Sequence, residues 1–337
     1  MNQKAKFISK FVQILKITSK INKNNMRKVT IVGAGNVGAT CADVLANKDI
    51  VNEIVLLDIK PNYAEGKALD MWESSPVNMF DTRIVGSTSD YSKTANSDVV
   101  VITSGIPRKP GMSRDDLIAT NAKIVKSVTE EVVKHSPNAV IVIVSNPLDV
   151  MTYAAFQAAK KSSNQVFGMA GVLDTARYRS FIALELDCSP KDIQAVLMGG
   201  HGDTMVPLPR YTTVGGIPVT DFISDERLDE IVARTKKGGG EIVNLLGTSA
   251  WYAPGAAAAQ MVEAIVKDSK RIFPVCAMLQ GEYGMENIAL GVPVKLGKNG
   301  IEEVIKLKLN DKEMEALKTS ASHVRKVMDT LDDMKLF

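Results

Sequence analysis

The stretch KVTIVGAGNVG, from Lys28 to Gly38, joins a run of β-branched and apolar residues to three glycines at the spacing GxGxxG. β-Branched residues favour a strand, and a strand that ends in a glycine-rich turn is typical of a βα unit. The residues between Val37 and Leu45 then repeat their apolar positions with a helical period. A second apolar run, EIVLLD, ends in Asp58, twenty residues after Gly38. The segment therefore predicts a complete βαβ unit.

Each part of this unit has a physical role in binding a dinucleotide. The glycines allow a tight turn and let the backbone approach a pyrophosphate at the N-terminus of the helix. The carboxylate of Asp58 can accept hydrogen bonds from the adenosine ribose, and it would repel the 2′-phosphate of NADP, so we expect NAD as the cofactor. The expected contacts come from the turn and from the aspartate: Gly33, Ala34, Gly35, Asn36, Val37, Gly38 and Asp58.

Further apolar runs predict more buried strands, alternating with helices. The expected strands are DVVVITSG at 98–105 and AVIVIVSNP at 139–147, and the expected helices span 117–134 and 151–161. This alternation indicates an α/β fold with a Rossmann doubly wound parallel sheet, in which ligands bind beyond the carboxyl ends of the strands. Asn146 and the loop that begins at Ile106 are thus expected beside the nicotinamide, although Asn146 could also serve only as a turn residue before Pro147.

The chain from about residue 169 onward has longer amphipathic helices and a hairpin-like sequence, VPVKLGKNGIEEVI. We therefore expect an NAD-binding domain at 26–168 and an α+β substrate-binding and catalytic domain at 169–337. No low-complexity linker separates them, so they should pack tightly. The last helix carries an apolar stripe made of Met314, Leu317, Ala321, Val324, Met328 and Leu331.

The first 25 residues form a basic extension with six lysines and no acidic residue. Removing these charges from the formal net charge of +3 leaves −3 for the rest of the chain, so the folded part lacks the positive surplus that nucleic-acid binding needs. We interpret residues 1–25 as a disordered tail or the product of an upstream start codon, because Met26 directly precedes the first strand. The alternative is a targeting segment, which would place the protein in the mitochondrial matrix rather than the cytoplasm.

Composition excludes other classes of protein. The chain has 337 residues, 45% of them hydrophobic, and no uninterrupted run of about 18 apolar residues that could span a bilayer. Its three cysteines, Cys41, Cys188 and Cys276, are far apart and form no CxxC pair. We expect buried free thiols in a reducing compartment, and neither a disulfide framework nor a metal site.

The loop IPRKPGMSR, from Ile106 to Arg114, carries Arg108, Lys109 and Arg114 and no acidic residue. Because surface loops usually balance their charges locally, this concentration of cations predicts an anionic ligand. The loop directly follows the strand-like run VVVITSG, at the edge of the sheet where the chemistry is expected.

Only three histidines are available for acid–base chemistry. His135 near the end of one helix and His323 off the apolar stripe of the last helix are expected to be structural, whereas His201 in MGGHGDTM is flanked by glycines that allow a ligand to approach. A proton-relaying histidine needs a carboxylate partner, and both Asp174 and Asp203 are candidates on sequence alone. Arg177 shares a helical face with Asp174, where it could bind a substrate carboxylate or simply form an ion pair.

These motifs in this order, namely GAGNVG, Asp58, IPRKPGMSR, VSNP, LDTARYR and GGHGD, resemble the lactate/malate dehydrogenase superfamily from Met26 to the C-terminus. Within it the sequence is similar to the malate dehydrogenases with the lactate dehydrogenase type of fold. The resemblance implies that His201 accepts a proton from the substrate and that Asp174 rather than Asp203 orients the His201 imidazole. It also implies that Arg177 binds the C1 carboxylate of the substrate.

The resemblance assigns further roles. Arg114 would polarise the C2 oxygen and Arg108 would bind the far carboxylate of a dicarboxylate substrate, where lactate dehydrogenases carry an uncharged residue. The remaining implied contacts are Asn146 and Ser249 with the substrate, the latter on a loose alignment, and Asn121, Val144, Ser145 and Asn146 with NAD. The implied reaction is the reversible oxidation of (S)-malate to oxaloacetate in a homodimer or homotetramer.

Other functions were weighed against this one. The same scaffold could act on pyruvate or another 2-keto acid, and a non-catalytic NAD-binding sensor would need no set of His201, Asp174, Arg177 and Arg114. A short-chain dehydrogenase is disfavoured, because the YxxxK spacing of Tyr63 and Lys67 follows directly after the ribose-binding aspartate instead of a later strand.

Overall fold

The computed structural model describes residues 27–107 and 113–337. The basic extension and Arg108 lie outside the described residues, so their predicted roles stay predictions. Among the helices that the structure describes, none is long and apolar enough to cross a membrane.

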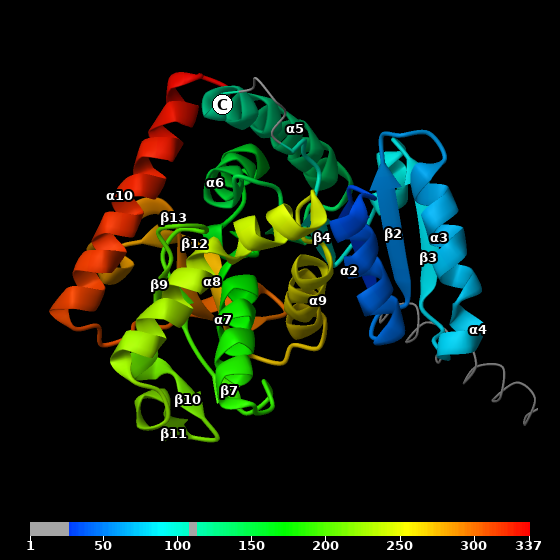
Figure 1. Ribbon diagram of the computed structural model, residues 1–337. Coiled ribbons are helices and arrows are strands. Elements are labelled where there is room, and N and C mark those ends of the chain that lie inside the picture. The colour runs from blue at the N-terminus through cyan, green and yellow to red at the C-terminus, as the bar shows by residue number, and fades with distance from the viewer. Residues whose placement is uncertain (1–26, 108–112) are drawn as a thin grey trace, which may run out of the picture.

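A nine-stranded sheet runs through the molecule, and six of its strands are parallel (Figure 1). These six are β1 (Lys28–Val32), β2 (Glu53–Asp58), β3 (Arg83–Thr88), β4 (Val99–Ile102), β5 (Val140–Ile143) and β6 (Val166–Gly168). They lie in the order β3-β2-β1-β4-β5-β6. The order reverses between β1 and β4, where Val29 pairs with both Ile54 and Val99. The predicted doubly wound sheet is confirmed, with its switch point beside the glycine-rich turn.

The strands that can be predicted from the sequence are those that are buried on both faces of the sheet. All four residues of β4 and all four of β5 are buried, because helices cover both faces of the sheet. By contrast, β3 buries only two of its six residues at the sheet edge, and its sequence RIVGST has no apolar run. This strand is absent from the sequence-based prediction for that reason.

The helices of the N-terminal half connect these strands. They are α2 (Asn36–Asn47), α3 (Tyr63–Glu73), α4 (Ser75–Asn78), α5 (Arg114–His135) and α6 (Leu148–Ala159). Helix α5 begins with a capping box, in which the Ser113 side chain accepts a hydrogen bond from the Asp116 N–H and the Asp116 carboxylate accepts one from the Ser113 N–H. This cap fixes the start of α5 at Arg114, the last residue of the cationic loop.

The C-terminal half extends the same sheet with antiparallel strands. Its main elements are α7 (Gly171–Leu186), α8 (Asp225–Leu246), α9 (Tyr252–Val266), β12 (Arg271–Gln280), β13 (Glu286–Gly297), β14 (Gly300–Val304) and α10 (Asp311–Asp333). Five two-residue strands lie between α7 and α8: β7 (Ile193–Gln194), β8 (Leu197–Met198), β9 (Val206–Pro207), β10 (Thr213–Val214) and β11 (Ile217–Pro218). Cys276 of β12 pairs with Gly168 of β6, and β13 and β14 form the predicted hairpin.

One hydrophobic core joins the two halves, as expected from the lack of a linker. The apolar stripe of α10 is part of this core, with Leu317, Ala321, Val324, Met328 and Leu331 buried and Met314 partly exposed. In Figure 1, the C-terminal end of α10 meets α5, and α10 also contacts α6. The three cysteines are free; Cys41 and Cys276 are buried as predicted, whereas Cys188 is only half-buried.

Candidate active site

The glycine-rich turn after β1 is packed too closely for side chains at two of its glycines. A Cβ added at Gly38 would lie 1.9 Å from the carbonyl oxygen of Gly33, and one at Gly33 would lie 2.5 Å from Oγ1 of Thr103. The Gly33 N–H also donates to the carbonyl oxygen of Leu57 over 2.8 Å, which ties the turn to β2. These two glycines are therefore required by the packing of the protein itself.

Gly35 has a different environment. A Cβ at this position would have no described protein atom within 4 Å. Gly35 is also the N-cap of α2, and no side chain of residues 27–107 or 113–337 caps this helix, which leaves its first-turn N–H groups to a ligand. Open space in front of a helix N-terminus suits a phosphate group, and the turn therefore fits the pyrophosphate of the expected cofactor.

Asp58 connects the turn to the end of β2. Its Oδ2 accepts a hydrogen bond from the Ala34 N–H over 2.7 Å, and its Oδ1 accepts one from the Lys60 N–H over 3.0 Å. Each carboxylate oxygen can accept a second hydrogen bond, so the predicted contact with the adenosine ribose is compatible with this geometry.

The loops after β4 and β5 are joined by the buried side chain of Asn121 in α5. Its Oδ1 accepts the Ile106 N–H over 2.9 Å, and its Nδ2 donates to the carbonyl oxygens of Ile106 and Asn146 over 3.1 and 2.7 Å. Asn121 thus positions the two loops, a role that the sequence did not predict. Ser145 adds a second link, since its hydroxyl donates to the Ser104 carbonyl oxygen over 2.5 Å. The exposed Asn146 side chain remains free to meet a ligand.

The second part of the site centres on His201. Its Nδ1 lies 2.9 Å from Oδ2 of Asp174, which is only 2% exposed in the first turn of α7. The structure therefore selects Asp174 over Asp203, which is exposed in the loop after His201. Arg177, one turn further along α7, places Nη1 3.5 Å from Oδ1 of Asp174. One carboxylate thus contacts both the imidazole and the guanidinium.

The surroundings of His201 favour its protonated form. Burial opposes the charge of the imidazole, but the carboxylates of Asp174 and Asp149 outweigh burial and raise the pKa of His201 to about 8. Arg177 opposes them with a smaller effect. Because an ionised carboxylate can only accept, Nδ1 carries the proton toward Asp174 and Nε2 is left as the atom that can exchange a proton with a ligand.

Two residues that hold the His201 loop were not predicted from the sequence. The His201 N–H donates to Oδ2 of Asp149 over 2.8 Å, and the Gly200 N–H donates to Oγ of Ser320 over 2.8 Å. Asp149 lies in the first turn of α6, where an acidic residue is ordinary, and Ser320 lies among the buried residues of α10. Neither position carries a local signal of a role in the site.

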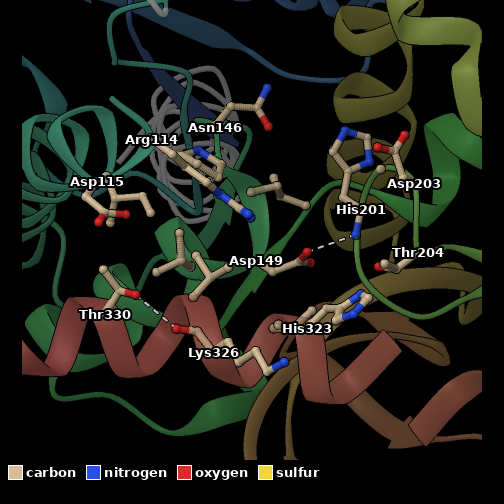
Figure 2. A pocket seen from close by; sticks show the side chains of 17 residues that line it. Arg114, Asp115, Asn146, Asp149, His201, Asp203, Thr204, His323, Lys326 and Thr330 are labelled. Atoms are coloured by element: carbon tan, nitrogen blue, oxygen red, sulfur yellow. Dashed lines mark hydrogen bonds between the residues drawn. The ribbon is translucent and has the colours of Figure 1, made fainter. Parts of the chain in front are cut away.

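A cavity of about 710 Å³ opens in front of these residues. His201, Asp149, Asn146 and Arg114 line it from one side, and α10 closes the other side with His323 and Lys326 (Figure 2). The structure thus brings together predicted residues from three separate motifs. Two predicted substrate residues do not line this cavity, and their roles stay predictions. Ser249 is exposed in the segment before α9, and Arg177 lies between Asp174 and Gly238 of α8.

Comparison with known proteins agrees with this architecture. Residues 27–168 match the family model for the lactate/malate dehydrogenase NAD binding domain, and residues 171–334 match that for the lactate/malate dehydrogenase alpha/beta C-terminal domain. The chain is 68% identical over 307 residues to a malate dehydrogenase from Cytophaga hutchinsonii, covering 91% of this chain and 98% of the relative.

Solved structures show the same relationship. A malate dehydrogenase structure from Salinibacter ruber is 59% identical with a TM-score of 0.88, covering 91% of this chain and 98% of that one. A lactate dehydrogenase from Cryptosporidium parvum, in complex with lactic acid and nicotinamide adenine dinucleotide, is 38% identical with a TM-score of 0.87 over 91% of this chain and 98% of that one. The resemblance read from the motifs is confirmed: the chain belongs to the lactate/malate dehydrogenase family.

Proposed function

We propose that this chain is an NAD-dependent malate dehydrogenase, which oxidises (S)-malate reversibly to oxaloacetate. The observation that carries the proposal is the contact of 2.9 Å between Nδ1 of His201 and the buried carboxylate of Asp174, at the edge of a cavity that Arg114 and Asn146 also line. A histidine fixed in this way is a general base or acid. The names of the relatives at 59–68% identity support the same activity.

In this proposal His201 accepts the hydroxyl proton of malate at Nε2, and Asp174 stabilises the imidazolium that forms. NAD, when bound, supplies the acceptor for the hydride that leaves C2 of malate. In the reverse direction the imidazolium returns its proton to the C2 oxygen. Because the neutral imidazole is needed to oxidise malate, kcat/KM for malate should rise as the pH rises through the pKa of His201, whereas kcat/KM for oxaloacetate should fall.

The arginines would hold the dicarboxylate. We assign Arg177 to the C1 carboxylate, Arg114 to the C2 oxygen and Arg108 to the far carboxylate, as the resemblance implies. Arg177 does not line the cavity, but it contacts the same Asp174 carboxylate as His201, and this shared contact supports the assignment. Asn146 would add a hydrogen bond to the substrate, and the turn at 33–38 with Asp58 would hold NAD.

The decisive test mixes the purified full-length chain with NADH and either oxaloacetate or pyruvate, and follows the absorbance of NADH. Rapid oxidation with oxaloacetate and little with pyruvate supports the proposal. Preference for pyruvate would instead assign the chain to lactate dehydrogenases, which the similarity to the Cryptosporidium parvum enzyme keeps as the second candidate. Binding of NADH without turnover of any 2-keto acid would indicate a sensor.

We further propose a division into an NAD-binding domain at 26–168 and a substrate-binding domain at 169–337, acting in the cytoplasm as a homodimer or homotetramer. Exposed apolar side chains support self-association, since Trp72, Val77 and Met79 are 41%, 80% and 84% exposed. Size-exclusion chromatography with light scattering tests the oligomer, and deletion of residues 1–25 tests whether activity and Tm depend on the extension.

A further inference from the structure

The loop that carries His201 has little stiffness of its own. Gly199 and Gly202 adopt positive φ angles of 85° and 117°, and glycine is the residue type with the greatest backbone freedom. The position of His201 must therefore be set by contacts with other elements. Gly199 exchanges two backbone hydrogen bonds with Gly291 of β13. The next two N–H groups add further contacts, because Gly200 donates to Ser320 of α10 and His201 donates to Asp149 of α6.

Asp149 differs from Ser320 in carrying a charge close to His201. Its Oδ1 is inaccessible to solvent, and its Oδ2 accepts the His201 N–H. The Cys276 thiol of β12 is the second hydrogen-bonding neighbour of this carboxylate. Burial, then the charge of Asp149 and the hydrogen bond to it, raise the pKa of the Cys276 thiol well above its ordinary value, so the thiol stays neutral. Part of Asp149 lines the same cavity as His201. A buried carboxylate lowers the stability of the fold unless a charged or hydrogen-bonding partner stabilises it.

We propose that Asp149 is a positioning residue of the active site, whose carboxylate fixes the backbone of His201 and places a second negative charge beside the His201–Asp174 pair. This inference rests on the proposed function and extends it, because Asp149 is assigned no contact with substrate or cofactor. The role combines a geometric part, which the neutral Ser320 shares, with an electrostatic part that Ser320 lacks.

The electrostatic part follows from mutual stabilisation of the two charges. Burial raises the pKa of Asp149 above its ordinary value. The charge and N–H of His201 and the Cys276 thiol oppose this shift in part, whereas Asp174 adds to it. Asp149 in turn is one of the groups that raise the pKa of His201. Among the described residues, the other charged or titratable groups around the pair are Asp174 and Arg177 of α7, Arg114 and Asp115 of α5, Asp203 of the loop, Cys276 of β12, and His323 and Lys326 of α10. Removing the charge of Asp149 should thus make the imidazolium a stronger acid.

The experiment compares Asp149→Asn with Ser320→Ala in the full-length enzyme. Asparagine keeps an oxygen that can accept the His201 N–H but removes the charge, whereas Ser320→Ala removes a loop anchor without changing any charge. For Asp149→Asn the midpoints of the kcat/KM profiles for malate and oxaloacetate should both move to lower pH, by about half a pH unit or more. Any change that Ser320→Ala makes to the rates should come from the loop geometry, and its midpoints should match those of the wild type.

A titration of the histidines provides a readout that is independent of turnover. The chain has three histidines, so selective ¹³C labelling and NMR can follow His201 separately from His135 and His323. The His201 midpoint should fall in Asp149→Asn and stay in place in Ser320→Ala. Asp149→Ser, which is neutral and smaller, replaces the asparagine variant if that variant does not fold. If the wild type is active and the His201 midpoint does not shift in the neutral variants, the inference is overturned. If the wild type has no malate dehydrogenase activity, only the proposed function is overturned.

Discussion

The turn at Gly33–Gly38 and the loop at Gly199–Gly202 each contain three glycines, but these glycines make different kinds of contact. In the turn, a Cβ at Gly38 would strike the backbone of Gly33, five residues away. In the loop, a Cβ at Gly200 would lie 2.6 Å from the Val324 side chain, and one at Gly199 would lie 2.7 Å from Oγ of Ser320, both in α10.

The closest contact in the turn, between Gly38 and Gly33, is local, although Thr103 also packs against both glycines. The closest contacts of Gly199 and Gly200 in the loop are instead made with a helix far along the chain. A site for a cofactor can be built from backbone groups at one helix N-terminus, and a short motif encodes it. Acid–base chemistry needs side chains with specific environments, and distant elements must supply these environments. Substitutions in the two regions should therefore affect different measurements.

The largest expected effect comes from His201→Asn, which removes the proton acceptor and leaves the turn intact. Turnover of oxaloacetate should fall roughly 10²- to 10⁴-fold, while NADH binding stays near that of the wild type. Steady-state kinetics and NADH fluorescence measure the two quantities. His135→Asn, at the end of α5 and outside the cavity, is the matched control and should retain activity. Near-normal turnover of His201→Asn would place the chemistry elsewhere.

The same contrast explains what the sequence can predict. The βαβ unit is local, so the strands, the helix and Asp58 follow from periodicity and spacing alone. The partner of His201 does not, because Asp203 is two residues away and Asp174 is twenty-seven, and only the packing of α7 against the loop buries Asp174. Asp149 and Ser320 were missed for the same reason. The motif order of the family supplied Asp174, which the residues alone left undecided.

Substrate choice should also depend on side chains outside the turn. Arg108→Gln tests this, since pyruvate would leave the arginine unpaired and oxaloacetate would pair with it. Loss of one partner of such a pair costs roughly 2–5 kcal/mol, or about 30- to several-thousand-fold, so kcat/KM should fall for oxaloacetate and rise for pyruvate. Lys109→Gln controls for general attraction of anions, which high salt would remove. If the ratio of kcat/KM for oxaloacetate to kcat/KM for pyruvate is unaltered in Arg108→Gln, this loop does not choose the substrate.

Within the turn, two alanine substitutions should separate folding from cofactor binding. Gly38→Ala inserts a Cβ 1.9 Å from the Gly33 carbonyl oxygen and should lower the free energy of unfolding by about 1–3 kcal/mol. Gly35→Ala meets no protein atom within 4 Å and should keep the Tm without NADH, yet weaken NADH binding by roughly tenfold, because the methyl group occupies the space of the pyrophosphate. Thermal unfolding and NADH titration check both. Normal NADH affinity in Gly35→Ala would show that the cofactor does not approach this glycine.

The last comparison concerns α8, a helix of 22 residues that contains Gly238, Gly239 and Gly240 in succession. Each glycine costs a helix up to about 1 kcal/mol relative to alanine, so three in succession call for a reason. Gly238 has one, because a Cβ there would lie 2.3 Å from Cδ and 2.7 Å from Nε of Arg177, whereas Gly239 and Gly240 have no described atom within 4 Å of an added Cβ.

Gly238→Ala should therefore displace Arg177 and raise KM for oxaloacetate by about tenfold, with a smaller change in kcat, because a carboxylate clamp binds the ground state and the transition state alike. Gly239→Ala changes helix propensity by the same amount at the next position and should only stabilise the fold, by about 0.5–1 kcal/mol. NADH affinity should stay constant in both variants, since neither touches the turn at 33–38. Equal KM values for Gly238→Ala and Gly239→Ala would show that Arg177 does not need the space beside Gly238 to bind the substrate.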